Sequence, residues 1–237
     1  MSFIPCGVVL IAIWGGLCSA DQRSLGGRQI HQPIVAAVGA GLLLGAPIPA
    51  LLVGLWLQLV WPVTMPVGGR LLPDTGAAGA AGGATAALIA GPLGVIAGIL
   101  LGLLLGFASI PWERRLRERN AAMEEAALER RGGKGLGRAV ARGIAGPFSR
   151  GALCALFAGT AGSLLSPRLA DPVTLAALGP WIGTAPGSLI GGAACVGLAT
   201  LLHRARAESG TGSVRWVAGG FLGGLLAWLL LHRGAGG

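Results

Sequence analysis

Charged residues are scarce in this chain, and their scarcity excludes an ordinary water-soluble globular protein. Only 11% of the 237 residues are Asp, Glu, Lys or Arg, about half the share of an average soluble domain, whereas 53% are hydrophobic. The 44 glycines and 14 prolines stand within runs of Leu, Ala, Val and Ile. This mixture is typical of membrane helices, in which small residues let the backbones approach closely.

Motifs for catalysis and for metal binding are also missing. The sequence has no HExxH, Walker or GxSxG motif, and no pair of carboxylates inside its apolar runs. Its four cysteines include no Cys-x-x-Cys pair, so neither a disulfide framework nor a zinc site is predicted. We therefore expect no catalytic residue, no metal and no cofactor. A membrane-embedded enzyme is the weakest interpretation.

Long stretches without a formal charge predict membrane segments. There are 41 such residues between Arg28 and Arg70, 38 between Asp74 and Glu113, and 32 over 172–203. One bilayer crossing needs about 20 apolar residues, so each of the first two runs holds two crossings, or one crossing and a re-entrant piece. The predicted fold class is an all-α, polytopic membrane helix bundle with roughly six to nine membrane segments.

Proline and glycine predict where the helices break. A first helix over 3–20, which we expect to be retained and not cleaved as a signal, leads through a polar connection to an apolar region over 33–61. Pro47 and Pro49 should break that region, and Gly91-Pro92 should interrupt the next, 75–112. Further apolar regions cover 147–167, 173–202 and 214–231, and prolines interrupt the second of these.

Basic residues are concentrated in one segment. Ten of the 18 Lys and Arg residues, with five of the nine acids, lie over 113–150, which gives a charge of +5. The positive-inside rule places this segment, and a second basic turn at 204–215, in the cytoplasm. No aromatic residue lies between 113 and 147 for base stacking, so nucleic acid is not an expected partner. The chain thus divides into N-terminal membrane segments (1–112), a basic cytoplasmic loop (113–146) and C-terminal membrane segments (147–237).

Two proline-broken stretches, 45–54 and 183–192, share a pattern of small residues around Ala-Pro. Paired broken segments indicate the binding region of a transporter, although Gly- and Ala-rich sequence also produces such likeness by chance. Glycines four apart recur, as at Gly79/Gly83 and Gly98/Gly102/Gly106. This spacing places the glycines of each set on one helix face and predicts close packing against another helix.

Polar side chains within the apolar regions are few, and each is a candidate for function. His31, Gln32, Gln58 and Asp74 belong to this group, because a polar group at membrane depth usually faces a cavity or another helix. For Asp74, an ion pair with Arg70 or a capped loop is as good an explanation as substrate contact. For His31, a helix start at the membrane surface is the alternative.

Six short motifs lie between positions 21 and 74: DQR (21–23), QIHQPIV (29–35), GLLLG (41–45), GLWLQLVW (54–61), GG (68–69) and PD (73–74). Their order resembles the early region of the IIC subunit of mannose/fructose/sorbose-type phosphotransferase systems, as does the spacing from Gln58 to Asp74. The chain departs from that pattern where the family usually has Glu, Asn and Gly-Asp, and here has Gln58, Pro66 and Gly45-Ala46. Gln58 still donates and accepts hydrogen bonds but carries no charge.

The resemblance implies a membrane subunit that translocates a hexose-type sugar together with a IID membrane subunit and is not itself an enzyme. A separate cytoplasmic IIB protein, charged by IIA, would phosphorylate the sugar. Gln58, Asp74, Gln32 and His31 would then bind the sugar, and we also expect a homo-oligomer embedded in the lipid bilayer of the bacterial inner membrane. The basic segment would be a docking surface for cytoplasmic partners or anionic lipid, and lipid attraction and simple orientation are the plainer explanations. A membrane channel or scaffold without a phosphotransferase link stays open as the alternative.

Overall fold

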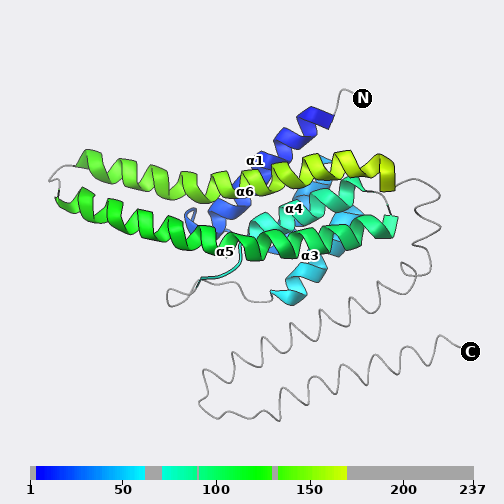
Figure 1. Cartoon of the computed structure of the whole chain (residues 1–237), viewed down its shortest axis with the longest axis horizontal. Helices are drawn as coiled ribbons and strands as arrows, with labels where there is room; N and C mark the ends of the chain where they lie inside the picture. Colours follow the sequence, from blue (N-terminus) through cyan, green and yellow to red (C-terminus); the bar gives the residue numbers. More distant parts are fainter. Residues whose placement is uncertain (1–3, 62–70, 90, 130–132, 170–237) are drawn as a thin grey trace, which may run out of the picture.

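The computed structural model describes residues 4–61, 71–89, 91–129 and 133–169. These residues form six α-helices and no strand (Figure 1), which confirms the predicted all-α fold class. The regions 173–202 and 214–231, the basic turn at 204–215, Pro66 and Arg70 lie outside the described residues. The helices are α1 (Ile4–Arg23), α2 (Pro33–Leu43), α3 (Pro47–Val60), α4 (Thr75–Leu88), α5 (Gly91–Glu129) and α6 (Gly133–Leu169).

Two of the predicted breaks fall between helices of the structure. The helix α2 ends at Leu43, Gly45 turns the chain with a φ of 74°, and α3 begins at Pro47. Proline is tolerated in a first helical turn, because the N–H groups there have no partner within the helix. Likewise α4 ends at Leu88, and α5 begins at Gly91, whose φ of 77° again favours glycine. Both breaks are confirmed.

The two longest helices, α5 and α6, lie side by side, and their paired ends project beyond the other helices (Figure 1). They continue through the segment predicted as a loop, which is helical over 113–129 and 133–146. Most of its residues are Arg, Ala and Glu, which are strong helix formers, so high charge does not prevent a helix there. Pro111 and Pro147 lie inside these helices without ending them. The boundaries drawn at 112 and 147 therefore fall within helices.

The short helix α4 occupies the centre of the bundle and contacts each of the other five helices. Its residues from Thr75 to Ala86 are all buried and are all Gly, Ala or Thr. These small side chains permit close approach: a Cβ added at Gly82 would lie 2.6 Å from the carbonyl oxygen of Gly98 in α5. The glycine series that begins at Gly98 (Gly98, Gly102, Gly106) faces α3 and α4, as its spacing predicts.

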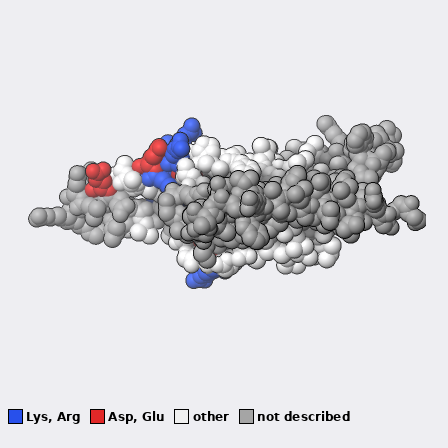
Figure 2. All heavy atoms as spheres, turned by 90° about the horizontal axis from the view of Figure 1, so that it is seen from below, with Lys and Arg blue, Asp and Glu red and all other residues white. Residues whose placement is uncertain are grey.

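Much of the outer surface of the bundle is apolar. Ile48, Leu104 and Leu164 expose 66%, 63% and 76% of their surface. Among the described helices, Gly91–Met123 and Ala139–Pro167 are long and apolar enough to cross a bilayer. In Figure 2 the coloured charged side chains lie in one half of the molecule. Over the described residues, an apolar exterior with the charges gathered in one part of the length is what a lipid-embedded bundle requires.

Candidate functional site

Asp74 begins the central helix α4 and is completely buried. Its carboxylate caps the helix, since Oδ1 accepts a hydrogen bond of 2.9 Å from the backbone N–H of Ala77. The backbone N–H of Asp74 donates to Oγ of Ser109 in α5 over 2.9 Å, and Ser19 of α1 donates to Oδ2. Asp74 thus connects three helices before any opposite charge is considered.

The opposite charge comes from Arg150 of α6, whose side chain is completely buried as well. Its Nε donates to Asp74 Oδ2 over 2.9 Å, and its Nη2 lies 2.7 Å from the same oxygen. Its Nη1 donates to Oε2 of Glu113 in α5 over 2.8 Å. One guanidinium therefore neutralises carboxylates from two helices. A rigid planar fork suits this task better than a lysine ammonium group would.

Glu113 is shared among three arginines. Besides Arg150, Nε of Arg117 donates to Oε1 over 2.9 Å, and Nη1 of Arg23 at the end of α1 lies 3.2 Å from Oε1. We call Arg23, Asp74, Glu113, Arg117 and Arg150 the ion cluster. It holds three positive and two negative formal charges and links α1, α4, α5 and α6.

Burial makes the ion cluster energetically demanding. A buried charge that loses its partner destabilises a protein by about 3–5 kcal/mol, so the members depend strongly on one another. Glu113 and Arg150 both lie within the two segments that are long enough to cross a bilayer. Ionisable residues at such positions usually serve a function, because an ordinary apolar residue would be less costly there.

His31 lies beside Asp21 just before α2 and is buried, with 7% of its surface exposed. Its Nδ1 is 2.8 Å from Asp21 Oδ2, and Asp21 also accepts the backbone N–H groups of Arg28 at 2.7 Å and His31 at 3.3 Å. The start of α2 is therefore held to the end of α1. His31 thus lies at a helix start and has a carboxylate partner that the sequence did not indicate; its position at the membrane surface stays a prediction.

The four predicted site residues come together only in part. His31 is joined to the start of α4, because Thr75 donates its hydroxyl to the carbonyl oxygen of His31 over 3.1 Å. Gln32 precedes α2, and its side chain donates to Gln29 Oε1 over 2.6 Å. His31 and Asp74 thus lie at neighbouring helix starts.

Gln58 stands apart, near the end of α3. Its Oε1 is buried and has no hydrogen-bond partner among the described residues, and the same holds for Nε1 of the nearby Trp56. A buried acceptor without a donor costs about 1–3 kcal/mol. Both atoms belong to the GLWLQLVW motif. In the described part of the chain, Gln58 forms no hydrogen bond with the other three predicted residues.

Arg150, Glu113 and Arg23 were not recognised as site residues from the sequence. Arg150 was counted with the basic segment, although it lies within the apolar region that begins at Pro147. An ionisable residue within a membrane segment indicates a functional role, and the sequence alone already contained this signal at Arg150. The alternative pairing of Asp74 with Arg70 stays a prediction, since Arg70 is outside the described residues, but Arg150 already pairs with this carboxylate. Over the ranges described, no group of three or more His, Cys, Asp or Glu side chains could hold a metal ion.

Comparison with known proteins gives a family match and a fold match. A family model described as "PTS system sorbose-specific iic component" matches residues 6–203. No curated protein matches the chain. A solved structure described as "Structure of membrane protein" matches with a TM-score of 0.60 at 17% identity, covering 96% of this chain and 95% of that one. At this identity, the structural likeness concerns the fold alone.

Proposed function

The chain belongs to the sorbose-specific IIC family of phosphotransferase-system components, the sugar permease subunits, and from this membership we propose how it acts. It translocates a hexose-type sugar across the bacterial inner membrane as a multi-pass protein, together with a IID subunit. A separate IIB protein, charged by IIA, phosphorylates the sugar on the cytoplasmic side. The observation that carries this proposal is the family match, which spans all six described helices.

The placement of charge supports the proposed orientation. The basic ends of α5 and α6 project from the bundle, and the positive-inside rule assigns such an end to the cytoplasm. We therefore propose that the segment 113–146, which is helical over 113–129 and 133–146, extends into the cytoplasm. Phosphorylating partners would approach the permease on this side.

We propose Gln58 as a direct sugar contact. Its Oε1 is a buried acceptor that receives no hydrogen bond from the described residues, and a sugar hydroxyl could donate one. The indole N–H of Trp56, which has no partner among the described residues, lies two residues earlier in α3 and would donate to a hydroxyl oxygen of the sugar or of a partner helix. Their lack of partners within the described residues motivates this role.

Asp74, His31 and Gln32 have a different proposed role at the site. The carboxylate oxygens of Asp74 are occupied by Arg150, Ser19 and the backbone of α4, so the residue positions helices around the sugar more readily than it contacts it. His31 and Gln32 fix the start of α2 next to Asp74. Sugar contact by these three would require their present bonds to open.

Replacing Gln58 with leucine is expected to weaken equilibrium sugar binding by roughly 5- to 150-fold, because a hydrogen bond to a buried group is worth about 1–3 kcal/mol. Binding is measured on the purified chain in complex with its IID partner. Gln58→Glu, which restores the acidic residue usual in the family, should retain binding. Unchanged sugar affinity in Gln58→Leu would show that Gln58 does not contact the sugar.

A further inference from the structure

The outer face of α5 changes from apolar to charged at Trp112. Leu100, Leu104 and Phe107 are all exposed, and their spacing places them on one face of the helix. Trp112 is 40% exposed, and the exposed side chains that follow it, up to Arg119, are all charged. An apolar face that ends at a tryptophan and is followed by arginines is typical of a helix that leaves a bilayer.

Two neighbouring helices place this boundary at the same level. Glu113 of α5 is bonded to Arg150 of α6 over 2.8 Å and lies 3.2 Å from Arg23, which ends α1. Before Arg23 in α1 and after Arg150 in α6, the leucines Leu17 and Leu153 are exposed. The ion cluster therefore lies at the edge of the apolar zone, and Trp112 is next to it in the chain.

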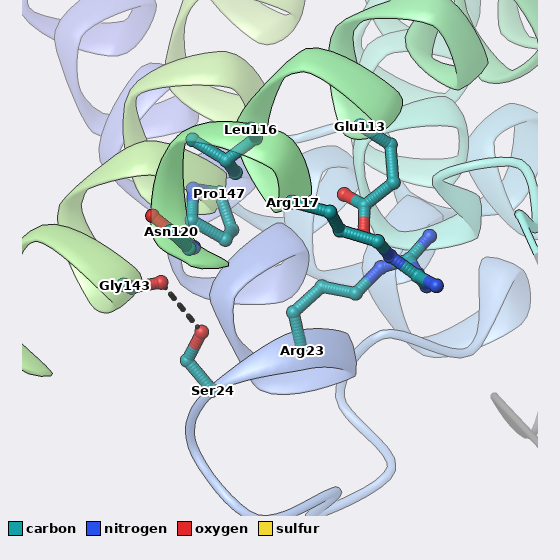
Figure 3. Close-up of a pocket in the computed structure, with 8 residues that line it drawn as sticks. All are labelled: Arg23, Ser24, Glu113, Leu116, Arg117, Asn120, Gly143 and Pro147. Atoms are coloured by element: carbon teal, nitrogen blue, oxygen red, sulfur yellow. Dashed lines mark hydrogen bonds and ion pairs between the residues drawn. The ribbon is translucent and has the colours of Figure 1, made fainter. Parts of the chain in front are cut away.

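One face of α5 is already occupied at this level. Glu113, Leu116, Arg117 and Asn120 line a pocket that faces α1 and α6 (Figure 3). These positions recur every three or four residues and so form one face of the helix. The residues between them face away from the bundle and are exposed: Arg114, Arg115, Glu118 and Arg119. This outward face carries three positive charges against one negative charge.

Arg115 and Arg119 carry the excess positive charge of this outward face. They lie four positions apart, so their guanidinium groups are neighbours on the helix surface and repel each other. The acid Glu118 lies four positions after Arg114 and so offsets the charge of that arginine. In the part of the chain that the structure describes, neither Arg115 nor Arg119 has a hydrogen bond or an ion pair. An anion between the two would remove their repulsion.

We propose that Arg115 and Arg119 bind the phosphate of an anionic phospholipid, with the Trp112 ring beside them at the depth of the headgroups. The three residues follow one another along one stripe of α5, at positions i, i+3 and i+7. Guanidinium groups match the oxygen geometry of phosphate, and the excess positive charge favours an anionic headgroup over a zwitterionic one.

The apolar face of α5 favours a lipid over a soluble phosphate ester. Leu104 and Phe107 are exposed on the bundle side of the two arginines, where the acyl chains of a bound lipid would lie. A soluble phosphate ester would leave that apolar surface uncovered. The inference rests on the exposed surface of α5 and does not depend on the proposed sugar transport.

The test uses the purified full chain in a neutral detergent. Binding of short-chain phosphatidylglycerol and of short-chain phosphatidylcholine is titrated by native mass spectrometry. Arg115→Gln and Arg119→Gln should each weaken phosphatidylglycerol binding about fivefold, since a basic residue near an anionic surface contributes about 1 kcal/mol. Phosphatidylcholine binding should not change. Both side chains are exposed, so neither substitution should disturb folding.

Arg142→Gln is the matched control. It removes the same charge from the same basic segment, but Arg142 lies in α6 beside Met123, which is beyond Arg119 in α5. Preferential binding of phosphatidylglycerol that Arg115→Gln and Arg119→Gln weaken and Arg142→Gln preserves supports the proposal.

Three results would overturn the proposal. Equal affinity of the wild-type chain for the two lipids would show that no anionic headgroup is selected. Equal losses in all three variants would show that the net charge of the segment, and not this site, attracts the lipid. Displacement of bound phosphatidylglycerol by an equal concentration of glycerol 3-phosphate would identify a soluble phosphate ester as the ligand.

Discussion

Replacing Arg150 with methionine is expected to destabilise the folded chain by about 3–5 kcal/mol, the cost of leaving buried carboxylates without their partner. Arg150 is fully buried and bonds Asp74 and Glu113 together, and Asp74 has no other arginine within ion-pair distance in the described part of the chain. The loss should appear as a large fall in melting temperature in detergent. The melting temperature is measured by size-exclusion chromatography of heated samples.

A second substitution distinguishes charge from packing. Asp74→Asn keeps the helix cap but removes the charge that Arg150 neutralises, and Glu113 still has Arg23 and Arg117 as partners. Arg150→Met combined with Asp74→Asn should therefore be more stable than Arg150→Met alone. If the two residues did not interact, the losses of stability caused by the two substitutions would simply add. A double variant as unstable as the sum of its parts would contradict the ion-cluster account.

Changing Gly82 to alanine is expected to destabilise the bundle by about 1–3 kcal/mol, although the same change in a free helix is favourable. The new Cβ would lie 2.6 Å from the Gly98 carbonyl oxygen and 3.0 Å from a methyl group of Val53. Because the Gly98 contact is backbone, no side-chain rotation relieves it, and α4 must move away from α5. Thermal unfolding in detergent measures the loss.

Gly137→Ala is the matched control for Gly82→Ala. Gly137 lies in α6, is exposed, and has no atom within 4 Å of an added Cβ. Here the substitution should be neutral or stabilising by up to about 1 kcal/mol, since alanine is the better helix former. Equal effects at the two positions would mean that close α4–α5 packing does not limit stability.

Local features of the fold followed from the sequence. The breaks at Pro47 and Gly91 depend on the chemistry of single residues, and the glycine face that includes Gly98 depends on helical spacing. Both kinds of feature can therefore be predicted without knowing which helices pack together. The helices over 113–129 and 133–146 were not predicted, because the charges of this segment were used to assign a side of the membrane. The propensities of its many Arg, Ala and Glu residues already favoured a helix there.

The candidate site could be predicted only in part, and the reason is physical. Asp74 stood out because an acid at the edge of an apolar run must be neutralised. Its partner Arg150 is 76 positions away, and only the packing of α6 beside α1 and α4 brings the two together. The buried pair of Asp21 and His31 is close in sequence, but its burial depends on the same packing. Pairings of this kind are set by tertiary structure and leave no local pattern.

We expect this chain to move a sugar across a membrane as one subunit of a phosphotransferase permease. The most direct measurement is uptake of a panel of radiolabelled hexoses into liposomes containing the chain with its IID partner, with phosphorylated IIB supplied. The account predicts accumulation of one of these sugars as its phosphate, and none when either membrane subunit is omitted. Uptake no greater than in empty liposomes for every sugar, or uptake that is indifferent to the presence of this chain, would contradict it.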